Sequence, residues 1–148
     1  ARIQRMIEHA DILLTARING RLVGISRALT DYSFATYLSD LAVDEECQGQ
    51  GIGRAFLDHM LGIARGAGCQ IVYLEVRPSN LAARHLYRQA GFQQIAIRPS
   101  YYPARSGRED ALRIVRPGDL RRLDAAFFTV NGALSIAFCL AVALDTLI

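Results

Sequence analysis

The feature that most constrains the fold of this chain is a glycine-rich turn at residues 48–53, where the spacing of hydrophobic residues changes. Residues 35–43, before the turn, are predicted as a strand, and residues 51–65 carry an apolar stripe at helical spacing. A second strand pattern follows at residues 71–76. A strand, a helix and a strand joined by short turns predict parallel strands with a right-handed crossover.

The rest of the chain adds strands at its start and a second helix in its middle. Residues 2–10 are predicted as a short helix, and Asn19-Gly20 between two apolar runs predicts a tight β-hairpin. Asn80 is the expected N-cap of a helix that ends before Gly91. The remaining strands are expected at residues 12–17, 22–26, 92–97 and 111–115. We therefore expect an α/β (α+β) fold whose mixed central sheet has antiparallel N-terminal strands, parallel middle strands and flanking helices.

The composition excludes several classes of protein. The chain has 148 residues, of which 51% are hydrophobic, so it can bury a core and is not disordered. A net charge of +3, with arginine as the only strongly basic residue type, is too small to indicate a nucleic-acid partner. The cysteines include no C-x-x-C pair and the histidines have no metal-ligand spacing, so we expect no metal, no disulfide framework and a cytoplasmic location.

The end of the chain differs from the rest in composition. We expect one folded domain over residues 1–116 and an apolar segment over residues 117–148. Residues 125–144 carry no charge and are long enough to cross a bilayer. Asn131-Gly132 interrupts this run as Asn19-Gly20 interrupts the first hairpin. We therefore expect a sheet-completing or swapped hairpin, with a buried helix or a membrane span as alternatives.

The position of residues 48–53 favours a phosphate ligand. The first turn of a helix leaves backbone N–H groups without partners and carries the positive end of the helix dipole. Glycines let a phosphate approach that backbone without a Cβ in the way, so a pyrophosphate is the expected ligand. The alternative is a tight turn that binds nothing. The turn lacks the Gly-Lys-Ser/Thr of a Walker A loop and the glycine spacing of a Rossmann loop.

Two motifs resemble those of the GNAT superfamily of N-acetyltransferases. They are Leu41-Ala42-Val43-Asp44 followed by Gln48-x-x-Gly51-x-Gly53-Arg54, and a helix that Asn80 opens and Leu86-Tyr87-Arg88-Gln89-Ala90-Gly91-Phe92 ends. Further stretches resemble the bacterial ribosomal-protein-alanine N-acetyltransferases, which acetylate the α-amine of a protein N-terminus. These stretches are Leu74-Glu75-Val76-Arg77-Pro78-Ser79-Asn80, Arg98-Pro99-Ser100-Tyr101-Tyr102-Pro103 and Gly107-Arg108-Glu109-Asp110-Ala111. The resemblance covers residues 3–116 and implies the GNAT fold without its usual first strand and helix.

The resemblance implies acetyl-CoA as co-substrate and suggests which residues bind it. The backbone of Leu41, Ala42 and Val43 is expected to pair with the pantetheine arm. Asn80 is expected to bind the same arm, with a plain N-cap as the alternative. The pyrophosphate is expected on the glycine-rich turn, bound by Gln48, Gly49, Gln50, Gly51, Ile52, Gly53 and Arg54. The alternative for Arg54 is a solvated helix residue.

Acetyl transfer to an amine also needs a base and a proton donor. Glu75 is the only charged residue of its strand and shares a face with Ile71 and Tyr73, so apolar neighbours are expected to raise the pKa of its carboxyl. The resemblance makes Glu75 the general base and Tyr87 the general acid that protonates the leaving CoA thiolate. The alternatives are a salt bridge at a strand end for Glu75 and a packing role for Tyr87.

Tyr101 and Tyr102 are expected to bind the acceptor. They precede Pro103 in a predicted loop between the last two strands, and a proline-stiffened aromatic loop suits an extended peptide. Loop packing is the alternative. The expected function is direct acetyl transfer to a protein N-terminus such as that of a ribosomal protein, with no membrane partner and with a homodimer left open. A small-amine acetyltransferase and a non-catalytic acetyl-CoA-binding module are the alternatives.

Overall fold

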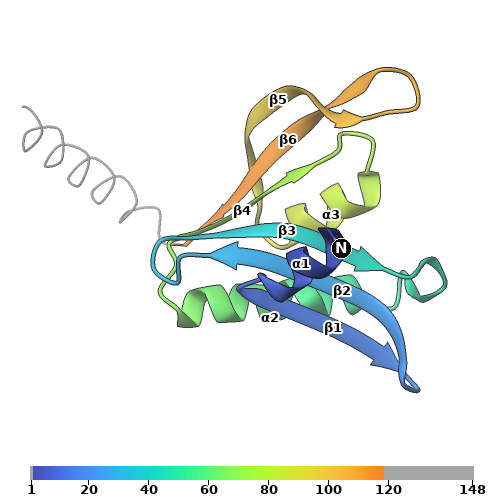
Figure 1. Ribbon diagram of the computed structural model, residues 1–148. Helices are drawn as coiled ribbons and strands as arrows, with labels where there is room; N and C mark the ends of the chain where they lie inside the picture. Colours follow the sequence, from blue (N-terminus) through green and yellow to red (C-terminus); the bar gives the residue numbers. More distant parts are fainter. Residues whose placement is uncertain (1, 119–148) are drawn as a thin grey trace, which may run out of the picture. The chain divides into compact units, whose positions relative to one another are not determined.

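The computed structural model describes residues 2–118, which form a mixed sheet and its helices (Figure 1). Six strands pair in the order β1-β2-β3-β4-β6-β5. Their bounds are β1 Ile12–Ile18, β2 Arg21–Thr30, β3 Ala35–Val43, β4 Ile71–Val76, β5 Gln93–Pro103 and β6 Arg108–Pro117. The helices are α1 Arg2–Glu8, η1 Glu45–Cys47, α2 Ile52–Gly66 and α3 Leu81–Gln89. The expectations for the apolar C-terminal segment, from residue 119 onward, lie outside the described residues.

The N-terminal strands form the antiparallel meander that the sequence predicts. Asn19 and Gly20 have φ values of 49° and 81°, the left-handed conformation that a two-residue hairpin turn requires. Strand β1 pairs with β2, and β2 pairs with β3, both antiparallel. Strand β2 extends to Thr30 and is longer than predicted, because its second half continues to pair with β3 across a bulge.

Helix α2 covers the sheet with the apolar stripe expected from its spacing. The stripe residues that become buried are Phe56, Leu57, Met60, Leu61 and Ala64. All of them except Phe56 join side chains of β3, β4, β6 and α3 in one core cluster, so α2 and α3 pack on the same face of the sheet. Within residues 2–118, no helix is both long and apolar enough to cross a membrane.

Strands β3 and β4 are parallel, as predicted, but they stay paired over only three residue pairs. The pairing begins at Ala35 and Ile71 and ends at Tyr37 and Tyr73. A register shift lies just beyond, where β2 pairs first with Leu38 and then with Asp40. Bulges bend a strand and end its pairing. The backbone of residues 38–43 therefore has no partner strand on the β4 side.

The sheet differs from the prediction at β5 and β6. A strand, helix and strand predict that β4 and β5 are parallel neighbours, but β6 lies between them and pairs antiparallel with both. The prediction of a direct β4–β5 pair is wrong because β5 and β6 form a hairpin whose second strand inserts beside β4. Tyr101 and Tyr102 also lie within β5, and not in a loop, because β5 continues past a bulge at Ser100, where φ is 51°.

Candidate active site

The turn before α2 presents backbone N–H groups that the protein leaves unpaired. Within the described residues, none of the consecutive N–H groups from Gly49 to Arg54 donates a hydrogen bond to a protein acceptor. Gly51 is the N-cap of α2, so no side chain caps the helix, and its φ of 84° is one that glycine adopts without strain. These groups and the positive end of the helix dipole give the turn the chemistry that an anion site requires.

The polar side chains of this turn stabilise the turn itself. Gln48 donates from Nε2 to the carbonyl oxygen of Val43 at 3.0 Å, and Gln50 donates to that of Glu46 at 3.3 Å. Asp44 accepts from the N–H of Glu46 and forms an ion pair with Arg21 at 2.6 Å. The two glutamines therefore shape the loop, and the unpaired donors of the turn are backbone N–H groups.

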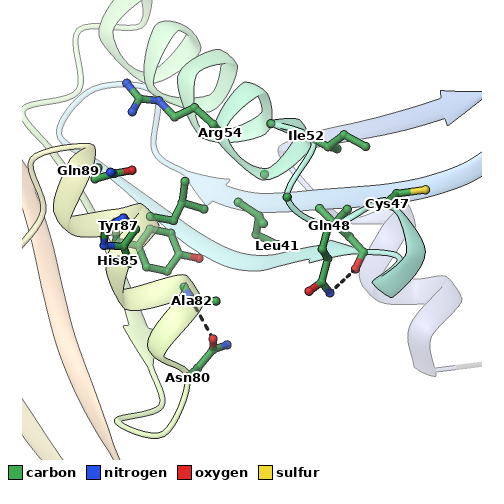
Figure 2. A pocket seen from close by; sticks show the side chains of 16 residues that line it. Leu41, Cys47, Gln48, Ile52, Arg54, Asn80, Ala82, His85, Tyr87 and Gln89 are labelled. Carbon is green, nitrogen blue, oxygen red and sulfur yellow. Dashed lines mark hydrogen bonds between the residues drawn. The ribbon is translucent and has the colours of Figure 1, made fainter.

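A cavity of about 370 Å³ lies between this turn, β3 and α3 (Figure 2). Predicted site residues in its wall are Leu41, Val43, Gln48, Gly49, Gly51, Ile52, Gly53, Arg54, Asn80 and Tyr87. Ala42 and Gln50, also predicted, are absent from the wall. Further wall residues that the sequence did not single out are Cys47, Ala82, Ala83, His85, Leu86 and Gln89. Ala82, His85, Leu86 and Gln89 are spaced at i, i+3, i+4 and i+7 along α3, a signal that could have revealed them.

Asn80 and Tyr87 are seven residues apart, about two helical turns, and both line this cavity from α3 and its N-cap. Asn80 Oδ1 accepts from the N–H of Ala83 at 3.0 Å, which confirms its capping role. Its side-chain amide nitrogen makes no hydrogen bond within residues 2–118, so capping leaves a donor for a ligand. In Figure 2, the Tyr87 hydroxyl points away from α3 toward the side of the cavity where Leu41 lies.

The Tyr87 ring is buried against Phe92, with ring centroids 5.6 Å apart, so its packing role is real. Burial, with a smaller contribution from Tyr102, raises the pKa of the Tyr87 phenol to about 12. Its hydroxyl therefore keeps its proton at neutral pH and can act as a donor. Arg54, by contrast, is exposed on the first turn of α2 and pairs with Asp58 at 2.9 Å.

Glu75 lies in a different environment from the one its sequence suggests. It shares a face of β4 with Ile71 and Tyr73, and its side chain is only 3% exposed. Its Oε1 accepts from Arg113 at 2.8 and 3.0 Å and from Arg98 at 3.1 Å. Burial raises the pKa of Glu75, but the hydrogen bonds from Arg113, Tyr37 and Arg98 outweigh burial and lower it below the ordinary value. The expected raised pKa is wrong, because β6 and β5 bring two cations that the β4 sequence cannot reveal.

Tyr101 and Tyr102 lie beside this carboxylate. The Tyr102 hydroxyl donates to the backbone carbonyl of Glu75 at 2.9 Å, and the guanidinium of Arg77 lies 4.3 Å from its ring centre. The Tyr101 ring packs edge-on against Tyr102 at 4.9 Å and against the guanidinium of Arg98 at 4.4 Å. The two tyrosines are therefore held rigidly next to Glu75, although neither is in the wall of the first cavity.

The residues present fit a nucleotide thioester such as acetyl-CoA. The unpaired N–H groups at residues 49–54 suit a diphosphate, and Leu41, Val43 and Leu86 give the cavity an apolar wall. Because β3 has no partner on its β4 side beyond Tyr37, its backbone there can pair with the amides of an extended arm. Glu75 follows Tyr73, the last β4 residue that pairs with β3. The part of the sheet where β3 and β4 are no longer paired therefore has cavity-lining residues on its β3 side and the Glu75 carboxylate on its β4 side.

The chain is similar to several proteins of known activity. A ribosomal protein bS18-alanine N-acetyltransferase of Escherichia coli K12 is 40% identical over 99 residues, which cover 67% of this chain and 66% of the relative. The chain thus spans just under two thirds of that relative's length. The crystal structure of the Escherichia coli ribosomal-protein-S18-alanine N-acetyltransferase superposes with a TM-score of 0.71 and 32% identity, covering 78% of this chain and 74% of the other.

A third similarity concerns the fold. A GNAT family acetyltransferase of Elizabethkingia anophelis, solved with acetyl-CoA bound, superposes with a TM-score of 0.66 at 23% identity, covering 78% of this chain and 81% of the other. The sequence model described as the acetyltransferase (GNAT) family matches residues 2–92, which include the turn, α2, α3 and Glu75. This chain therefore belongs to the GNAT family of acetyltransferases.

Proposed function

We propose that this chain is an acetyl-CoA-dependent N-acetyltransferase that transfers the acetyl group directly to the α-amine of a protein N-terminus. The observation that carries the proposal is the interrupted β3–β4 pairing. Unpaired N–H groups and the Tyr87 phenol belong to elements that line the cavity, and the buried carboxylate of Glu75 follows the interruption on β4. This arrangement supports a reaction at the gap between β3 and β4, with the acetyl donor, acetyl-CoA, held by residues at α2 and α3.

Acetyl-CoA would supply an acetyl group activated as a thioester. The N–H groups of residues 49–54 would bind its diphosphate, and the backbone of Leu41, Ala42 and Val43, which has no partner strand on the β4 side, would pair with its amide-containing arm. The Asn80 amide would add one donor to that arm. Arg54, in the wall of the cavity, is the one charged side chain proposed to contact acetyl-CoA. The other contacts that align the thioester are made by backbone groups and by the Asn80 amide.

Two protons must move during the transfer. Glu75 would accept a proton from the amine as the new N–C bond forms, since its low pKa keeps it ionised at neutral pH. Tyr87 would donate the proton of its hydroxyl to the sulfur as the C–S bond breaks, and its raised pKa keeps that proton in place until then. Glu75 is the proposed general base and Tyr87 the proposed general acid.

The acceptor is proposed from two observations. The relative in Escherichia coli K12 is named for an alanine of a ribosomal protein. In this chain, the aromatic pair Tyr101 and Tyr102 lies beside Glu75, braced by Arg98 and Arg77. Rigid aromatic side chains next to the base would suit the first residues of an extended peptide.

The test is acetyl transfer by the full 148-residue chain. CoA release is measured with acetyl-CoA and a peptide that begins with alanine. The control is the same peptide with a formylated N-terminus, and a panel of small amines forms a third arm. Release with the free peptide alone supports the proposal. Release with small amines alone contradicts the proposed acceptor, and calorimetric acetyl-CoA binding without any release contradicts catalysis.

A further inference from the structure

We infer that Arg113 is a positioning residue that holds the Glu75 carboxylate by one oxygen and so fixes its orientation and its charge. The inference rests on the proposed role of Glu75 and deepens it. Arg113 is absent from the motifs that mark the family resemblance, and its contact with Glu75 arises only because β6 inserts beside β4.

The contact geometry supports this role. Arg113 donates to the same oxygen, Oε1, from Nε at 3.0 Å and from Nη2 at 2.8 Å. Arg98 donates to Oε1 as well, at 3.1 Å. Neither arginine makes a hydrogen bond to Oε2. The two arginines therefore hold the carboxylate through one oxygen, Oε1.

Strand register makes Arg113 the more rigid of the two partners. Glu75 and Arg113 are directly paired across β4 and β6, where opposite side chains interact most strongly. Arg98 reaches Glu75 from β5, one strand further away, and its guanidinium also lies over the Tyr101 ring. Its side chain is 45% exposed, compared with 37% for Arg113. Arg113 therefore limits the motion of Glu75 more than Arg98 does.

The charge balance around Glu75 depends on the same contact. The titratable and charged groups that surround it come from four strands: Tyr37, Tyr73, Arg98, Tyr101, Tyr102 and Arg113. Only the two arginines are cations. Burial raises the pKa of Glu75, and the hydrogen bond from Arg113 is the largest effect that lowers it. Without Arg113, burial is opposed mainly by Tyr37 and Arg98, so protonation at higher pH is expected.

The test measures this protonation directly. The chain contains five glutamates, so carboxyl carbon resonances of ¹³C-glutamate-labelled protein can be resolved by NMR, and Glu75→Gln assigns the Glu75 signal. Arg113→Met is expected to raise the titration midpoint of Glu75 by about one to three pH units. Arg113→Lys keeps the positive charge with a single donor group. Its Glu75 midpoint is therefore expected to lie between those of the wild type and Arg113→Met. Arg116→Met is the control, because Arg116 lies on the same strand and pairs with no acid within residues 2–118.

Kinetics separate positioning from a general structural role. The acid limb of the pH profile of kcat is expected to move upward with the Glu75 midpoint in Arg113→Met, while the KM for acetyl-CoA stays unchanged. An unmoved midpoint in folded Arg113→Met overturns the inference. If Arg113→Met does not fold, a wild-type Glu75 midpoint in Arg113→Lys overturns the inference instead. A moved midpoint with an unmoved kcat profile also overturns the positioning role, whereas an inactive wild-type chain overturns the proposed function instead.

Discussion

Gly53 offers the sharpest test of the cavity, because its substitution should change binding and stability in opposite directions. It lies in the first turn of α2, and its φ is outside the left-handed region, so a side chain causes no backbone strain. A Cβ built there would lie 3.5 Å from Leu86 and 3.8 Å from Leu41, both in the cavity wall. The added methyl group would therefore make ordinary contacts and occupy space inside the cavity.

The two magnitudes follow from this geometry. Gly53→Ala is expected to stabilise the fold by about 0.5–1 kcal/mol, since alanine loses less entropy than glycine in a helix. For a domain of this size, that raises Tm by about 2–6 °C. Crowding a well-packed site costs about 1–3 kcal/mol, which corresponds to about a 5- to 150-fold weaker Kd for acetyl-CoA, and Gly53→Val should lie at the weaker end.

Thermal unfolding and calorimetric titration with acetyl-CoA measure the two effects separately. Gly62→Ala is the matched control, because Gly62 lies on the same helix with nothing within 4 Å of its added Cβ. It should gain similar stability and keep wild-type affinity. If folded Gly53→Val binds acetyl-CoA as tightly as the wild type, the cavity is not the acetyl-CoA site.

The remaining predictions concern the two proposed proton-transfer groups. Glu75→Gln is expected to lower kcat about 10²- to 10⁴-fold with an unchanged KM for acetyl-CoA, and steady-state kinetics that retain more than about a third of wild-type turnover contradict its role as base. Tyr87→Phe should keep the packing on Phe92 but lower kcat. Because folding raises the pKa of Tyr87 from 10.0 to about 12, wild-type stability should fall as pH rises through that window. The loss approaches about 2–3 kcal/mol, and urea unfolding that shows the same alkaline loss in Tyr87→Phe would contradict the assignment.

Features that depend on neighbouring residues could be predicted from the sequence. The hairpin at Asn19-Gly20 forms because the backbone conformation of the turn is local, and Asn80 caps α3 for the same reason. The apolar stripe of α2 follows from helical spacing alone. The cavity wall was largely predicted as well, since the turn and α3 each carry a local motif.

Features that depend on long-range pairing could not be predicted. The place of β6 between β4 and β5 depends on which strand edges meet, and no local pattern encodes that choice. The error in the pKa direction of Glu75 follows directly, because Arg113 is 38 residues away in sequence and becomes a neighbour only through this pairing. The extension of β5 through Tyr101 and Tyr102 likewise depends on a bulge against β6.

The lowered pKa of Glu75 bears on which amine the site suits. A carboxylate held by two arginines is a weak base, but it is ionised throughout the neutral range. A weak base suffices when the acceptor is already partly neutral. With a pKa near 8, about a tenth of an α-amine is neutral at pH 7, compared with about 0.04% of a lysine side chain with a pKa near 10.4. With such a weak base, the neutral fraction of the amine alone favours an α-amine over a lysine side chain by about two orders of magnitude at about pH 7, in line with the proposed acceptor.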